Sequence, residues 1–294
     1  MSDSREQKIG VLYAVSAFGF WGLVPIYFKA VAHVTPLEIL CHRVVWSVPL
    51  TALLITLGGG WPALRTALGD RKVLATLLLT ATLVAGNWFI FIYAVNTDRV
   101  LQASLGYFIN PLVNVLLGVI FLRERLRPFQ VTAVILAAVG TLNLTFRAGQ
   151  FPWIALTLAF SFGFYGLLRK TVQIESVNGL FVETCLVCPP AIACLLYLGA
   201  RGKMAFGTVD ATTTILLFLA GAVTTFPLVW FTSGARRLRY ATVGLLQYMA
   251  PSLHFVLAVF LYREPFGGEQ LVSFGFIWTA LLIYAVDSHA AHRR

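Results

Sequence analysis

The sequence predicts an all-α integral membrane protein with ten transmembrane helices, arranged as two inverted repeats of five helices. Three observations predict this fold class: the composition, the length of the uncharged stretches and an internal repeat. Hydrophobic residues make up 59% of the chain, charged residues make up 12%, and the mean hydropathy is +0.81. A soluble domain carries about twice that fraction of charge.

The uncharged stretches are about 17–25 residues long, which is the length that a helix needs to cross a bilayer. Helices are favoured over strands because lipid offers no partner to an unpaired peptide group. Glycine, proline and charged residues mark the connections between the stretches. The predicted spans are residues 8–30, 37–57, 73–96, 100–122, 128–146, 150–168, 177–199, 212–235, 240–262 and 268–287.

The first span is predicted to be a mature helix and not a cleaved signal peptide. Its uncharged run at 9–28 follows Arg5 and Lys8 and lacks a small-residue cleavage site. The run is also longer than the apolar core of a signal peptide. We therefore expect one membrane domain without a soluble module.

Two strings repeat across the chain. Residues 105–124 read LGYFINPLVNVLLGVIFLRE and residues 245–264 read LLQYMAPSLHFVLAVFLYRE, so Pro111 aligns with Pro251. This offset of 140 residues (251 − 111) is nearly half of the 294 residues. The string FGFWGL at 18–23 is echoed by FGFYGL at 162–167. These repeats predict two five-helix halves, residues 1–147 and 148–294, within one integrated membrane domain.

An odd number of spans in each half turns the second half upside down relative to the first. Secondary transporters commonly have this arrangement and bind their solute where the two halves meet. Ten spans also place both termini on one side, which then receives 15 of the 22 Lys and Arg residues, against 6 on the other side. Positive residues favour the cytoplasm, so both termini are expected there.

Several other classes of protein are disfavoured by the sequence. The net charge of +10 comes from basic residues scattered between apolar runs, with no nucleic-acid motif. Cys185 and Cys188 have CxxC spacing without a second pair or a histidine cluster, so buried cysteines are favoured over a zinc site. The chain has no ATP-binding loop, HExxH motif or recognisable catalytic triad. We expect no enzyme activity, metal or cofactor.

Several strings resemble one known family. They are EILCHRVVWS at 38–47, ASLGYFINPL at 103–112, GFYGLLRK at 163–170, GARRL at 234–238 and LQY at 246–248. These strings look like those of RarD-type permeases, in the EamA group of the drug/metabolite transporter superfamily. The resemblance covers roughly residues 8–288 and implies a multi-pass permease of two EamA-like halves in the bacterial inner membrane. It implies the fold and the transport class, and leaves the substrate open.

Arg43 is the first candidate for the substrate pathway. It lies about two turns into the second span, where a charged residue costs about 2.5–3.5 kcal/mol, so it should face the bundle interior. Its planar guanidinium matches a carboxylate or phosphate group of a solute. The alternative is an internal pair with Glu38 or with a carbonyl at a helix end.

Two acidic residues are candidates for proton coupling. Glu183 has no Lys or Arg within one turn of its own span, and Glu38 occupies a comparable place in the first half. A carboxylate at such a depth tends to be protonated or to have a partner on another helix. The alternative is that both lie at the membrane interface.

Further candidates for the pathway are polar or aromatic. Asn114 and His254 are equivalent in the repeat, as are Tyr107 and Gln247, and symmetry places such pairs at comparable depths. The alternative role is bonding between helices, worth about 0.6 kcal/mol per bond. The complete set of pathway candidates is Arg43, Trp21, Trp88, Tyr107, Asn110, Asn114, Gln247, Tyr248 and His254.

Pro111 and Pro251 are the candidate hinges, because each removes a backbone hydrogen bond within a span and they are equivalent in the repeat. A fixed bend without motion is equally allowed. The hypothesis is a secondary transporter that moves a small metabolite or drug-like molecule by alternating access, with the bilayer and the solute as partners. The alternative is a non-transporting membrane protein, either an intramembrane enzyme or a scaffold that senses lipid or ligand. The sequence predicts no particular oligomeric state.

Overall fold

The computed structural model describes residues 2–147, 151–263 and 268–292, and all regular structure in these ranges is helical. This confirms the predicted all-α class. The elements are α1 (Ser2–Ala30), α2 (Pro36–Leu57), α3 (Trp61–Leu68), α4 (Arg71–Asn96), α5 (Val100–Phe121), α6 (Pro128–Arg147), α7 (Trp153–Thr171), α8 (Ser176–Ala200), α9 (Ala211–Arg237), α10 (Tyr240–Gln247), α11 (Met249–Val256), the π-helix η1 (Leu257–Leu261) and α12 (Gly268–His292).

Within the described ranges, eight helical segments are long and apolar enough to cross a membrane: α1, α2, α4, α5, α6, α8, α9 and the combined segment from α10 to η1. Helix α12 contributes a shorter apolar stretch, Leu271–Asp287. Helix α7 is 19 residues long and carries Arg169 and Lys170 in its last turn, which lower its hydropathy. The structure therefore supports a multi-pass membrane protein, while the count of ten spans stays a prediction.

Two elements differ from the sequence-based expectation. The connection after residue 57 contains the short helix α3, which begins at a Trp-Pro pair. The single span expected at 240–262 is divided into α10, α11 and η1. Proline removes a backbone donor and its ring clashes with the carbonyl four residues earlier. For Pro251 that residue is Gln247, where α10 ends.

Side chains fix the start of several helices. Thr35 caps α2 by accepting a hydrogen bond from the backbone N–H of Glu38, and Asp70 accepts one from Lys72 at the start of α4. Asp210 accepts hydrogen bonds from Thr213 at the start of α9, and these bonds lower the pKa of Asp210. Each cap satisfies a donor that the first helical turn leaves unpaired.

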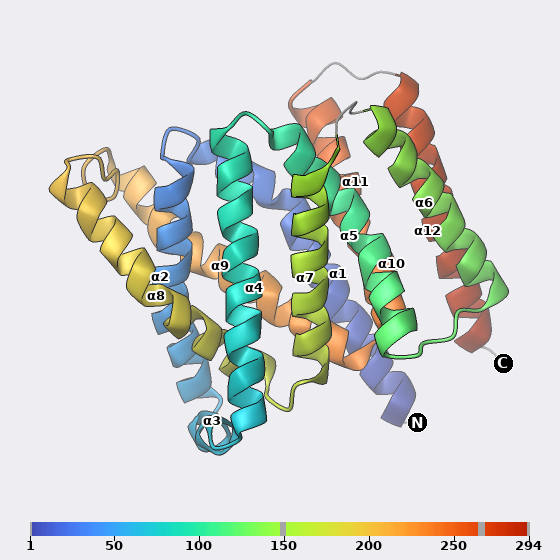
Figure 1. The fold of residues 1–294 in the computed structure, drawn as a ribbon, viewed down its shortest axis with the longest axis horizontal. Coiled ribbons are helices and arrows are strands. Elements are labelled where there is room, and N and C mark those ends of the chain that lie inside the picture. The colour runs from blue at the N-terminus through green and yellow to red at the C-terminus, as the bar shows by residue number, and fades with distance from the viewer. Residues whose placement is uncertain (1, 148–150, 264–267, 293–294) are drawn as a thin grey trace.

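The helices form one bundle in which segments far apart in sequence lie side by side. Figure 1 shows α2 and α8 at one edge and α6 and α12 at the opposite edge, and each of these pairs is in contact. Helices α1, α5, α7, α9 and α10 lie between them. Both chain ends lie at the lower end of the view, on the same side as α3 (Figure 1).

Glycines allow the closest helix crossings. A Cβ atom on Gly221 of α9 would meet the backbone and the Cβ of Trp46 in α2, and one on Gly140 of α6 would meet the carbonyl oxygen of Ser273 in α12. Small residues at such crossings let the backbones approach, which is how helices gain packing energy in a membrane.

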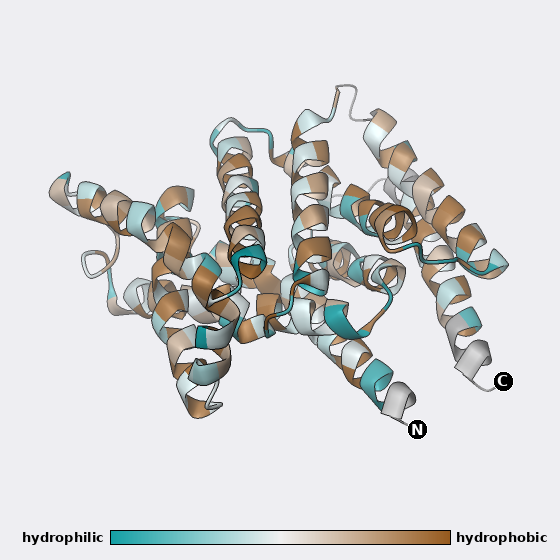
Figure 2. Ribbon diagram, turned by 60° about the horizontal axis from the view of Figure 1, so that its bottom comes forward, coloured by the Kyte–Doolittle hydropathy of each residue, from teal (hydrophilic) through white to brown (hydrophobic). Residues whose placement is uncertain are grey.

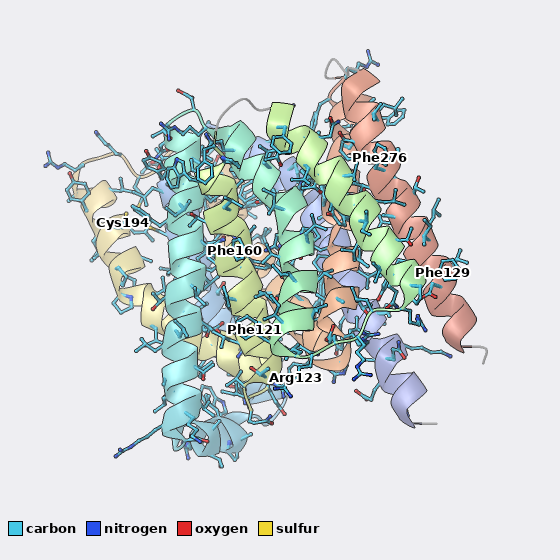
Figure 3. The ribbon with its side chains drawn as sticks, turned by 45° about the vertical axis from the view of Figure 1, so that its right-hand side comes forward. Phe121, Arg123, Phe129, Phe160, Cys194 and Phe276 are labelled. Carbon is cyan, nitrogen blue, oxygen red and sulfur yellow. The ribbon has the colours of Figure 1, made fainter. Side chains whose placement is uncertain are left out.

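The outer surface suits contact with lipid. Hydrophobic residues cover the bodies of the helices, whereas hydrophilic residues gather at helix ends and connections (Figure 2). Several outward side chains are large and apolar, including Phe121, Phe129 and Phe160, which are 58%, 64% and 38% exposed (Figure 3). Exposed apolar area of this extent marks a surface that does not face water.

A carboxylate joins the end of α5 to the start of α10. Arg123 has a left-handed backbone (φ 53°), and so does its repeat equivalent Arg263 (φ 54°). This turn carries Glu124 back toward α10, where its two oxygens accept the backbone N–H groups of Tyr240 (2.6 Å) and Ala241 (2.9 Å). The cap therefore crosses from one half of the sequence to the other.

Replacing Glu124 with alanine should lower stability, because two backbone donors at the start of α10 would lose their partner. We expect a loss of about 1–3 kcal/mol, measured as thermal or denaturant unfolding of the detergent-purified protein. Glu6→Ala is the matched control, since Glu6 pairs with Arg237 at an exposed site where such pairs contribute about 0–1 kcal/mol. Equal stability of the two variants would contradict the role given to Glu124.

Candidate solute-binding site

Arg43 lies where four helices meet. Its Nε donates a hydrogen bond to the hydroxyl of Thr224 on α9 at 2.8 Å. Its guanidinium carbon lies 5.2 Å from the ring centre of Trp88 on α4 and 5.9 Å from that of Phe28 on α1. Cations and aromatic faces attract each other at such separations. The side chain is therefore held by contacts with α1, α4 and α9.

Among the described residues, no carboxylate forms an ion pair with Arg43. Glu38, one turn away on α2, has its Oε1 occupied by the backbone N–H groups of Ala205 (2.7 Å) and Phe206 (3.0 Å). The terminal nitrogens of Arg43 have no hydrogen-bond partner in the described part of the chain, yet they are not fully enclosed. The outer edge of the guanidinium is therefore left without a protein partner among the described residues.

Tyr107 lies near Arg43, and His254 contacts Tyr107. Tyr107 lies close enough to Arg43 to interact with it electrostatically, although 41% of its side chain is exposed. The ring of His254 meets it edge-on at 5.9 Å, and His254 Nε2 donates to the carbonyl oxygen of Trp21 at 3.0 Å. Tyr107 therefore keeps exposed surface although it lies near Arg43. The structure thus brings together Arg43, Trp88, Tyr107, His254 and Trp21.

The three amide candidates bond to one another. Asn114 donates to Gln247 Oε1 at 2.7 Å, and Asn110 accepts from Gln247 and donates to the carbonyl oxygen of Ala159 at 2.6 Å. All three are buried. The cluster ties α5 to α10 and α7, and it does not contact Arg43.

Tyr248 is placed elsewhere. It is fully buried, its hydroxyl lies 3.1 Å from that of Thr141 on α6, and it packs in the cluster formed by α6 and α12. Of the two candidate hinges, Pro111 lies within the continuous helix α5, whereas Pro251 follows the interruption between α10 and α11.

Glu183 belongs to a buried polar network near the end of the bundle where the termini lie. Its Oε1 is 3.4 Å from Nε of Arg169 and accepts a hydrogen bond from Thr80 at 2.6 Å, while its Oε2 accepts one from Tyr165 at 3.2 Å. Arg169 also donates to the carbonyl oxygen of Ser176 at 2.9 Å. This network connects α4, α7 and α8.

Five residues of these two sites were not predicted from the sequence: Arg169, Thr80, Tyr165, Thr224 and Phe28. The predicted span 150–168 leaves Arg169 in a connection, but α7 continues to Thr171 and buries Arg169 completely. The available signal was its place in the string GFYGLLRK at 163–170, which follows the repeated FGFYGL. The two threonines carry no such signal, because single hydroxyl groups are common in membrane helices.

Comparisons with known proteins agree with this architecture. The EamA-like transporter family matches residues 8–146. An uncharacterized transporter of Vibrio cholerae is 48% identical, with 99% of this chain and 98% of that protein covered. Protein RarD of Escherichia coli is 44% identical, with 99% of each chain covered, and the chloramphenicol-sensitive protein RarD of Pseudomonas aeruginosa is 33% identical, with coverage of 95% and 94%.

The fold also has a counterpart among solved structures. One crystal structure superposes with a TM-score of 0.73 and 19% identity over 98% of this chain and 99% of that chain. The chain therefore belongs to the EamA-like transporter family, as a RarD-type permease. It is a membrane transporter, a multi-pass protein of the bacterial inner membrane that acts on a small-molecule solute.

Removing one member of the buried Arg169–Glu183 pair should destabilise the protein strongly, because the other charge would remain buried without compensation. We expect Glu183→Leu to cost about 3–5 kcal/mol in thermal or chemical unfolding. The double variant Arg169→Met/Glu183→Leu should recover much of this loss. A single variant as stable as the parent, or a double variant less stable than both singles, would show that the pair does not act as described.

Proposed function

We propose that this chain is a secondary transporter that moves a small organic solute by alternating access between its two five-helix halves, with the solute bound beside Arg43. The observation that carries this proposal is a guanidinium deep in the bundle with free terminal nitrogens and no carboxylate partner among the described residues. A cation at this depth is expensive unless it faces a water-filled cavity or a ligand.

The packing of the helices supports two inverted halves. Under the repeat, α1 corresponds to α7, α2 to α8, α4 to α9, α5 to the segment α10–η1, and α6 to α12. A two-fold relation requires each contact to have a counterpart: α1 packs on α9 as α7 packs on α4, and α5 packs on α7 as α11 packs on α1. Helices equivalent in the repeat also contact each other, as in the pairs α2–α8, α5–α10 and α6–α12.

Rocking of the halves would use the interruption in the segment from α10 to η1. The break between α10 and α11 and the π-helix η1 lie next to Pro251, whereas the equivalent Pro111 lies in an unbroken helix. Helix interruptions and π-turns are frequent at functional sites in membrane proteins. The proposed motion therefore bends this segment more than α5.

Proton coupling is proposed for Glu183, with Glu38 as the second candidate. Protonation of Glu183 would remove the charge that compensates Arg169 and so loosen the junction of α4, α7 and α8. Protonation of Glu38 would weaken its hold on the connection that contains Ala205 and Phe206. Glu183 joins different helices, and Glu38 joins a helix to a connection. A group that couples protonation to motion needs such contacts.

Cells with and without the protein should differ in the accumulation of at least one compound from a panel of metabolites and antibiotics. The difference should shrink with a protonophore, because the proposed driving force is a proton gradient. Arg43→Ala at normal abundance should abolish it by removing the binding group, whereas Thr82→Ala, at an exposed position of α4, should not. Equal accumulation of every compound, or full activity in Arg43→Ala, would contradict the proposal.

A further inference from the structure

We propose that the chamber beside Arg43 selects monocarboxylates that carry a planar aromatic group, and that it rejects amino acids. This inference rests on the proposed function and adds a substrate class to it. For this purpose the chamber is defined by Arg43, Thr224, Phe28, Trp88 and Tyr107, with His254 against Tyr107.

The geometry of Arg43 suits a carboxylate. Thr224 occupies only the Nε side of the guanidinium, which leaves the terminal nitrogens for a ligand. Thr224 is itself buried and donates to the carbonyl oxygen of Ala220 at 3.0 Å, so its oxygen is fixed when it accepts from Arg43. The plane of the guanidinium is therefore set before a ligand arrives. Two parallel N–H groups then match the two oxygens of a carboxylate.

The charge balance of the chamber favours a monoanion. Arg43 supplies one positive charge, and no second Lys or Arg of the described chain takes part in the contacts around it. A carboxylate neutralises this charge, whereas a phosphate ester that carries two charges would bring an uncompensated one into a low-dielectric site. A guanidinium can bind either a carboxylate or a phosphate, and the single charge of this site favours the carboxylate.

The same balance disfavours amino acids. The counter-charge of an α-ammonium group would have to come from a carboxylate, and the buried acidic side chains of the described chain are Glu38 and Glu183. Glu38 is held by two backbone N–H groups, and Glu183 by Arg169, Thr80 and Tyr165. Neither is free to receive an ammonium, whose desolvation would then lack a counter-charge.

Aromatic rings form the remaining walls. Trp88 and Phe28 face the guanidinium, and Tyr107 meets His254 edge-on while 41% of its side chain stays exposed. An aromatic group of the ligand can pack against Tyr107, which contributes about 0.5–1.5 kcal/mol beyond the burial of apolar area. A short aliphatic acid such as acetate would satisfy Arg43 without filling this space.

Binding can be measured on the detergent-purified full chain by calorimetry, with phenylacetate as the probe. We expect phenylacetate to bind, and its neutral amide, acetate and phenylalanine each to bind about tenfold more weakly or worse. The amide lacks the charge, acetate lacks the ring, and phenylalanine adds an ammonium group.

Two variants test the residues of the chamber. Arg43→Gln should weaken phenylacetate binding by about 30-fold or more, because a charged partner is lost. Thr224→Val should weaken it by about tenfold, because the guanidinium loses its fixed orientation. Thr232→Val is the matched control, since Thr232 is also buried on α9 and also donates to its own helix, and it should bind as the parent does. Unchanged melting temperatures would show that each variant is folded.

The possible failures are distinguishable. Equal binding of phenylacetate and its amide, tight binding of phenylalanine, or an unchanged affinity in Arg43→Gln would overturn the substrate class. Failure of phenylacetate, benzoate and phenylpyruvate to bind would do so as well, and then transport of a neutral solute in cells would leave the transporter proposal standing. Binding of the acids without any transport would instead contradict the proposed function.

Discussion

A positive charge kept inside an apolar bundle, with no counter-ion among the described residues, is the constraint on which this structure depends. The bundle holds Arg43 with one hydrogen bond from α2 to α9 and with the aromatic faces of α1 and α4. These contacts orient the guanidinium but do not neutralise it. A protein that maintains such a charge must give it water or an anion, and the proposed transport cycle provides both in turn.

Three carboxylates of the bundle, in contrast, have partners within the protein. Glu124 caps α10, Glu38 holds the connection before α9, and Glu183 lies against Arg169. Each satisfies its charge within the protein and in doing so joins elements that the repeat assigns to different halves or different helices. The contrast separates these carboxylates, which hold the bundle together, from Arg43, which we propose is available for a solute.

Much of the fold could be predicted from the sequence because a helix must fill the thickness of the bilayer with apolar residues. The positions of the helices follow from that requirement, and so does the prediction that Arg43 faces the bundle interior. Hydropathy gives depth along a helix but not rotation about its axis, so Tyr107 and Tyr248 could not be told apart, although one lies beside Arg43 and the other faces α6. The partners Thr224 and Arg169 depend on helix packing and on the true end of α7, neither of which is local in sequence.

The central claim is a chamber at the junction of the halves that opens to one side of the membrane at a time. It is tested most directly by Tyr107→Cys in a background in which Cys41, Cys185, Cys188 and Cys194 are replaced by serine. A charged maleimide that does not cross the membrane should label this position from one side, and the transported solute should protect it. Tyr248→Cys, fully buried against α6, should resist the reagent. Labelling of Tyr107→Cys from neither side, or equal labelling of both positions, would contradict the account.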